Sequence, residues 1–160
     1  MKIIGIDPGY DRLGIAVVEK LPKQKEILLY SSCLQTSYKD DFYKRLKIIG
    51  KEVVKVIEKY SPNILAIESL FITKNQKTAM KVSEVKGIII YEGIKNNMEI
   101  CEYTPLQIKM AVTGHGKSDK TQIIKMIPLL IKLEKRAWKD DEYDAIAVAL
   151  TCLAYIKKEM

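Results

Sequence analysis

The sequence has few cysteines, one histidine and no long apolar run. Its three cysteines are widely spaced, with neither an even number for disulfides nor the spacing of a zinc site, which favours a reducing cytoplasm. The longest uncharged runs are about ten residues, too short to span a bilayer. The first residues lack the long apolar region of a signal peptide, so we expect a cytoplasmic protein without membrane contact.

Linker-like segments are also missing. No stretch rich in Gly, Ser or Pro divides the 160 residues and no internal repeat is visible, so we expect a single domain over residues 1–160. A composition of 48% hydrophobic and 29% charged residues is near the globular average and excludes extended disorder, a coiled coil or a disulfide scaffold. What the chain has in excess is positive charge, +7 at pH 7. That excess favours a polyanionic partner, with nucleic acid as the first candidate.

The spacing of apolar residues predicts an α/β chain. Residues 2–7, 13–19 and 26–35 form three strands whose short connections allow only an antiparallel meander. Helical spacing then alternates with two further strands, 64–70 and 99–103. The predicted helices cover residues 40–60, 76–95, 105–112, 118–132 with a break at Pro128, and 140–157. This order is that of the ribonuclease H-like fold, a mixed five-stranded sheet (antiparallel meander, then parallel strands) flanked by helices.

Two carboxylates stand at the ends of predicted strands. Asp7 ends the first strand just before Pro8 and Gly9, where the simpler interpretation is an Asx-type turn. Glu68 interrupts an otherwise apolar central strand, and a buried carboxylate is costly unless it is paired or binds a cation. Because open α/β sheets bind ligands at the carboxyl ends of their parallel strands, the position of Glu68 favours a functional role.

A third acidic group begins the last helix. Asp141 and Asp144 are three residues apart and share one helical face, although Asp140 could share the face of Asp144 as well. Capping of the helix N-terminus explains Asp140 and Glu142, whereas Asp144 borders an almost wholly apolar segment. Oxygen ligands from strand ends and helix, with no Cys/His cluster to compete, predict a site for Mg²⁺ or Mn²⁺. Two such ions would suit phosphodiester hydrolysis.

Four segments resemble, in order, the four motifs of RuvC-type Holliday-junction resolvases. They are residues 4–9, 66–71 followed by Lys74, 112–116 followed by Lys120, and 141–147. The resemblance implies a homodimer with a ribonuclease H-like fold that nicks two opposed strands of a four-way DNA junction symmetrically, using Mg²⁺, in homologous recombination and DNA repair. It further implies a branch-migration motor of RuvA and RuvB type as a partner.

The resemblance also assigns roles to single residues. It matches Asp7, Glu68, Asp141 and Asp144 to the metal-binding carboxylates of the family, and thereby selects Asp141 over Asp140. It matches Phe71 to an aromatic residue near the junction centre, where core packing is the alternative. Lys109 and Lys120 match basic positions that meet DNA, although a single surface lysine is usually only a solvated charge. His115 occupies a variable position, and we expect it to take no part in the chemistry.

Further lysines lie close in sequence to Glu68. Lys74, Lys77 and Lys81 are spaced for one helical face, with Lys86 beyond them, and either phosphate contact or a solvated face explains them. The same helix has an apolar stripe including Val85 and Ile89, which would pack on the sheet or on a second subunit. Symmetric cleavage of a junction requires an enzyme with two-fold symmetry. An isologous contact between two copies of the chain is the simplest way to produce that symmetry.

Three other functions remain open from the sequence. One is a ribonuclease H-like nuclease with a different substrate. Another is an actin-like phosphate-binding ATPase, since residues 5–9 also resemble the first phosphate loop of that class, but it requires a second nucleotide domain for which 160 residues are too few. The third is a junction-binding protein without catalysis, which the presence of all four carboxylates argues against.

Overall fold

The computed structural model describes residues 1–70 and 76–159. Within them, five strands and five helices follow the order predicted from the sequence. The strands are β1 (Lys2–Asp7), β2 (Arg12–Glu19), β3 (Ile27–Gln35), β4 (Ile64–Glu68) and β5 (Glu99–Tyr103). The helices are α1 (Phe42–Tyr60), α2 (Gln76–Lys95), α3 (Pro105–Thr113), α4 (Lys120–Leu130) and α5 (Asp140–Glu159).

The strands form one mixed sheet in the order β3-β2-β1-β4-β5. β1, β2 and β3 pair antiparallel, as the short turns between them require. β4 then joins the other edge of β1 in parallel, and β5 pairs parallel with β4. The predicted meander and parallel strands are therefore confirmed, and the arrangement is that of the ribonuclease H-like fold.

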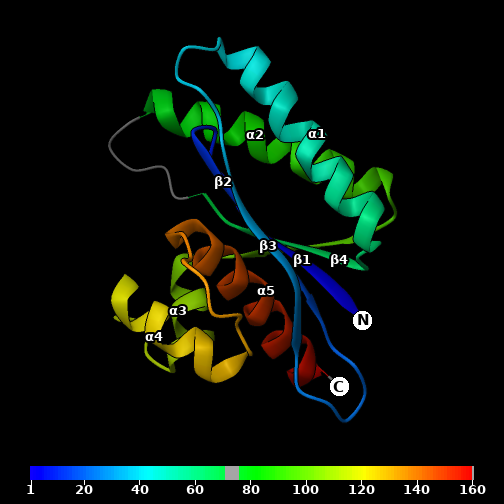
Figure 1. Ribbon diagram of the computed structural model, residues 1–160, viewed down its shortest axis with the longest axis vertical. Coiled ribbons are helices and arrows are strands. Elements are labelled where there is room, and N and C mark those ends of the chain that lie inside the picture. The colour runs from blue at the N-terminus through cyan, green and yellow to red at the C-terminus, as the bar shows by residue number, and fades with distance from the viewer. Residues whose placement is uncertain (71–75, 160) are drawn as a thin grey trace.

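Helices cover both faces of this sheet, with α1 and α2 on one side and α3, α4 and α5 on the other (Figure 1). The two-residue period of the strands divides the core between these layers. Ile4 and Ile6 of β1 pack with the buried residues of α1 and α2, whereas Ile3 packs with those of α5. The strand residues that alternate with Ile4 and Ile6 therefore face α5.

Glycines allow α5 to lie directly on the sheet. A Cβ atom on Gly5 of β1 would overlap the carbonyl oxygen of Ala145, and a Cβ atom on Gly14 of β2 would overlap the carbonyl oxygen of Asp141. Any side chain at these two positions would push the helix away. The first turns of α5 are therefore held against the backbones of β1 and β2.

Helix α4 differs in detail from its predicted form. It begins at Lys120 rather than Ser118, because Asp119 and Gln122 form a capping box at its N-terminus. It also continues through Pro128 to Leu130, where a break was predicted. Proline so close to a helix C-terminus removes few backbone hydrogen bonds, which explains its tolerance here. None of the helices in the described part of the chain has the length and apolar character needed to cross a bilayer.

Candidate active site

Two neighbouring parallel strands bring Asp7 and Glu68 to the same edge of the sheet. Ile6 of β1 pairs with Ile67 of β4, so the residue after each lies at the carboxyl end of its strand. Asp7 alternates with Ile6, and Glu68 with Ile67, both of which pack toward α1 and α2. Both carboxylates therefore face α5, as the two-residue period of a strand demands.

The first turn of α5 supplies the facing acidic residues. Asp141 and Asp144 are both partly buried, and the close approach at Gly14 places the backbone of Asp141 against β2, where a Cβ atom would also meet that of Asp7. The structure thus brings the four predicted carboxylates together from β1, β4 and α5. Asp140, the alternative to Asp141 in the sequence pattern, is exposed at the helix start.

The electrostatics of the site reflect this crowding. Burial, followed by the negative charges of Asp144, Glu68 and Asp141, raises the pKa of Asp7 to about 7. Burial and the charge of Asp144 likewise raise the pKa of Glu68. The pKa of Asp144 is raised chiefly by its own burial, against an opposing effect from Lys120. Like charges held this close favour protonation or a bound cation.

Two basic side chains balance part of this charge. Lys120, the first residue of α4, places its Nζ 2.9 Å from Oδ2 of Asp144 and 3.6 Å from Oδ2 of Asp140. Arg12, the first residue of β2, forms an ion pair with Asp141. Among the described residues, no three His, Cys, Asp or Glu side chains are close enough, as they stand, to hold a metal ion.

The donor set nevertheless fits a hard divalent cation. All four groups offer carboxylate oxygens, the ligands that Mg²⁺ prefers. Burial, and after it their mutual repulsion, raises the pKa of Asp7 to about 7, and a cation among them would remove the repulsion. Lys120 and Arg12 have long side chains that are about half exposed, at 51% and 46%, so both can turn outward without disturbing the core.

A pocket of about 230 Å³ opens beside these carboxylates. Glu68 and Asp144 line it together with the two predicted DNA-contacting lysines, Lys109 and Lys120, and with apolar residues of α3, α4 and α5. Acidic and basic groups thus share one opening. Such a pocket suits a ligand with a phosphate group beside a metal.

Other predicted residues lie further out or outside the described part. Phe71 and Lys74 fall among residues 71–75, which the structure does not describe. Lys86 pairs with Glu102 of β5 at 2.5 Å, so it faces the sheet edge, and Lys81 lies 5.3 Å from the ring of Tyr10. His115 is exposed in the loop before α4.

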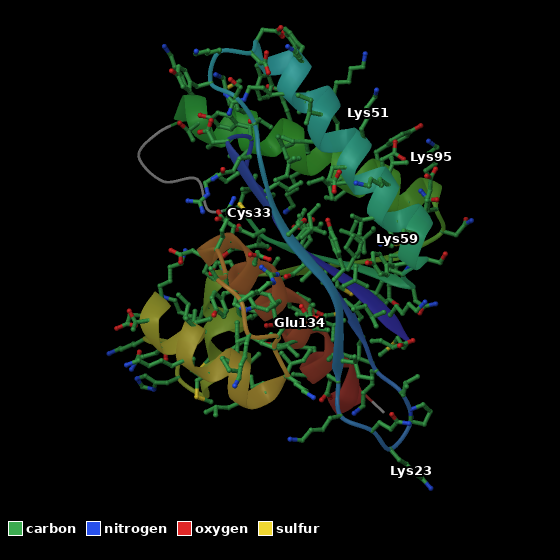
Figure 2. The ribbon with its side chains drawn as sticks, viewed as in Figure 1. Lys23, Cys33, Lys51, Lys59, Lys95 and Glu134 are labelled. Carbon is green, nitrogen blue, oxygen red and sulfur yellow. The ribbon has the colours of Figure 1, made fainter. Side chains whose placement is uncertain are left out.

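Sequence reasoning missed two contacts of Asp141. Besides its ion pair with Arg12, Asp141 accepts a hydrogen bond from Cys33 Sγ of β3 at 3.4 Å. Figure 2 labels Cys33 on β3 close to where α5 begins. No local signal could have revealed this contact, because Cys33 and Asp141 are 108 residues apart. For the ion pair with Asp141, the one available signal is the positive charge of Arg12, which lies close in sequence to the predicted metal-binding residue Asp7.

A mixed sheet with carboxylates ending β1 and β4 opposite an acidic helix start defines the ribonuclease H-like class. A family model described as crossover junction endodeoxyribonuclease RuvC matches residues 3–152. The protein of that name from Thermosipho melanesiensis is 44% identical over 154 residues, covering 96% of this chain and 97% of that protein. The one from Petrotoga mobilis is also 44% identical, over 149 residues, covering 93% and 91%. The chain belongs to the RuvC family.

Solved structures agree with this assignment. Thermus thermophilus RuvC in complex with Holliday junction substrate matches with a TM-score of 0.92 at 28% identity, covering 99% of this chain and 96% of that chain. The yeast mitochondrial Holliday junction resolvase Ydc2 matches with a TM-score of 0.72 at 15% identity, covering 98% and 79%. At that lower identity, the likeness to the yeast protein supports the fold alone.

The crowding of carboxylates predicts that Asp7→Asn stabilises the metal-free protein. The unfolded chain ionises Asp7 near pH 3.8 and the folded chain near pH 7, so the folded state binds the extra proton and wild-type stability falls as pH rises from about 4 to 7. Asparagine avoids this loss. In chelator at pH 8, we expect the free energy of unfolding to rise by about 1–3 kcal/mol, measured by urea denaturation.

The gain should disappear at about pH 3 and below, where Asp7 is protonated in both the folded and the unfolded state. Asp119→Asn provides the matched control, because Asp119 is an exposed helix N-cap at which asparagine serves equally well. Its effect should stay within about 0.5 kcal/mol. An Asp7→Asn variant less stable than wild type at pH 8 would contradict the electrostatic account of the site.

Proposed function

We propose that this chain resolves four-way DNA junctions as a structure-selective endodeoxyribonuclease, hydrolysing one phosphodiester bond in each of two opposed strands. The observation that carries the proposal is the meeting of Asp7 and Glu68, from two parallel strands, with Asp141 and Asp144 at the start of α5. Membership of the RuvC family and the close likeness to a RuvC solved with a Holliday junction support the substrate.

We infer that these four carboxylates hold Mg²⁺, two ions per site, with Mn²⁺ as a substitute. Such ions would supply an activated water and stabilise the leaving oxygen. The carboxylates position this chemistry at the carboxyl edge of the sheet. The raised pKa values of Asp7, Glu68 and Asp144 support the assignment, since burial and then mutual repulsion disfavour their charged forms and a cation would stabilise those forms.

Lysines beside the pocket would hold the DNA backbone. Lys120 contacts Asp144, and we infer that it exchanges this carboxylate for a phosphate oxygen when the site is loaded. Lys109 lines the same pocket and would contact a neighbouring phosphate. The net charge of +7 favours approach of a polyanion from any direction. Roles in DNA binding for Phe71 and Lys74 rest on the resemblance of their motif.

A homodimer would place two such sites on one junction. On α2, Val85 and Ile89 are buried against the sheet, whereas Met80, Tyr91 and Ile94 are exposed at 67%, 62% and 60%. These three residues and Gly87 form a stripe along the outer side of the helix. Nothing lies within 4 Å of a Cβ atom built on Gly87. We propose that this stripe packs against its counterpart in a second copy.

The remaining features fit this function. We propose that residues 1–160 act as a single nuclease domain, in a reducing cytoplasm that suits the free cysteines Cys33, Cys101 and Cys152. A branch-migration motor of RuvA and RuvB type as a further partner rests on the family resemblance. The family membership argues against an actin-like ATPase.

Cleavage assays on matched substrates test the proposed activity. With Mg²⁺, the wild type should cut a synthetic four-way junction and leave duplex DNA and an RNA–DNA hybrid of the same sequence intact. Asp7→Asn should bind the junction as the wild type does, because the basic contacts remain. Its cleavage rate should fall by at least about 100-fold, because it loses a metal-facing charge. Asp119→Asn should behave as the wild type.

Full cleavage by Asp7→Asn would remove Asp7 from the metal site. Cleavage of the hybrid in place of the junction would instead identify a ribonuclease H-like nuclease with another substrate. If the wild type binds the junction but does not cleave it in either Mg²⁺ or Mn²⁺, the protein is a junction-binding protein without catalysis.

Sedimentation of single variants tests the α2 interface. Tyr91→Arg introduces a charge into the stripe of both copies, so the dimer dissociation constant should rise about 100-fold or more. Tyr38→Arg is the control, since Tyr38 is 83% exposed and lies outside α2. Equal dissociation constants for the two variants would show that the interface is elsewhere.

A further inference from the structure

Glu142 is a buried carboxylate that faces away from the metal-facing residues on either side of it. Its residue is only 3% exposed, yet it lies between Asp141 and Asp144 in the sequence. Burial alone would raise the pKa of Glu142, but hydrogen bonds from Arg136, the backbone of Lys139 and Ser31 lower it instead. Glu142 is therefore a charged group held inside the protein by its partners.

Four hydrogen bonds satisfy the two oxygens of this carboxylate. Oε1 accepts from Ser31 Oγ at 2.8 Å and from Arg136 Nη2 at 2.6 Å. Oε2 accepts from Arg136 Nη1 at 3.2 Å and from the backbone N–H of Lys139 at 3.0 Å. The Arg136 contact is thus bidentate, the strongest geometry for this pair of groups. The Lys139 contact caps the first turn of α5.

Arg136 is held in place by contacts with Trp138 and Ser31 as well as by Glu142. Its guanidinium lies 3.7 Å from the ring centre of Trp138, and Nη2 also donates to Ser31 Oγ at 2.9 Å. The indole N–H of Trp138 donates to the carbonyl oxygen of Glu134 at 3.0 Å. A segment without regular structure before α5 is thereby fastened to β3. Figure 2 labels Glu134 in this segment, beside β3.

Strand β3 also contacts Asp141, the residue of α5 that precedes Glu142. Ser31 and Cys33 are two apart on β3 and so face one side. Ser31 donates to Glu142, and Cys33 donates to Asp141 at 3.4 Å. Two consecutive helix residues are therefore tied to two residues of one strand face. Because the first turn of a helix lacks partners for its N–H groups and frays readily, these ties help to fix Asp141, together with its ion pair to Arg12 and the close approach of its backbone to Gly14.

We propose that Arg136 and Glu142 are positioning residues, whose ion pair holds the first turn of α5 so that the carboxylate of Asp141 can join those of Asp7 and Glu68 around a metal ion. This inference rests on the proposed metal site. The pair touches neither substrate nor metal and acts through the backbone of α5. Without it, the first turn frays and displaces Asp141, whereas Asp144, one turn further on, stays docked by the contact of Ala145 with Gly5.

A double variant removes the pair without stranding a buried charge. Arg136→Ala alone would leave the Glu142 carboxylate unpaired inside the protein and could prevent folding. Arg136→Met/Glu142→Gln keeps the side-chain volumes and lets the amide oxygen accept from Ser31 or Lys139. The control is Lys132→Met, since Lys132 lines the same pocket along β3 without a bond to Glu142. Trp138 is the single tryptophan, so increased acrylamide quenching verifies release of the segment.

Mn²⁺ binding to the DNA-free protein provides a readout independent of activity. Electron paramagnetic resonance measures free Mn²⁺, and the double variant should bind at least about tenfold more weakly than the wild type, a size typical of losing a residue that orients a metal ligand. Lys132→Met should bind as the wild type does. Junction binding in chelator should be unchanged in all three proteins, because the lysines near Glu68 are untouched.

Each outcome separates the two proposals. A double variant with a lower melting temperature but wild-type Mn²⁺ affinity would show that the pair only stabilises the fold, and would overturn the inference while leaving the metal site intact. A wild type that binds no Mn²⁺ would overturn the proposed metal site itself, and the inference with it. Weaker Mn²⁺ binding together with increased Trp138 quenching in the double variant supports the positioning role.

Discussion

The backbone of α5 lies directly against the backbones of β1 and β2, and the candidate site depends on this contact. Gly5 and Gly14 make it possible, since a Cβ atom at either position would overlap a carbonyl oxygen of the helix. Burial of the apolar residues of α5, from Ala145 to Leu153, against the sheet supplies the driving force. The acidic first turn is therefore brought to the carboxyl ends of the strands by packing that is mainly apolar.

This packing brings like-charged carboxylates together, and the basic residues of the site reduce their repulsion. Carboxylates from β1, β4 and α5 are partly buried together, and their repulsion opposes the docking of α5. Lys120 and Arg12 reduce the repulsion through ion pairs with Asp144 and Asp141. On our account, divalent cations replace them and release Lys120 to contact phosphate. A protein of net charge +7 can thus attract DNA and still present an acidic centre.

Features with a local sequence signal were predictable. Strand alternation and helical spacing predicted the element order, and the strand-end positions of Asp7 and Glu68 pointed to the edge of the sheet where the structure places them. The selection of Asp141 over Asp140 required the family resemblance, because both residues satisfy the helical spacing. The ends of α4 were predicted less well, since a capping box and the tolerance of Pro128 depend on single hydrogen bonds.

Long-range contacts left no trace in the sequence. The bond between Cys33 and Asp141 spans 108 residues, and the bond between Ser31 and Glu142 spans 111. Such contacts arise only when β3 and α5 are placed by the sheet and its core. Capping alone was expected of Glu142, and its hydrogen bond from the backbone of Lys139 agrees with that. Its burial against Arg136 and Ser31 follows from the three-dimensional packing.

Anomalous diffraction from crystals of the protein soaked in Mn²⁺ tests the central claim most directly. The account predicts anomalous density within bonding distance of Asp7 and of carboxylates from β4 and α5, with the ammonium group of Lys120 turned away from Asp144. Density elsewhere on the protein, or none at these carboxylates while Lys120 stays on Asp144, would contradict it.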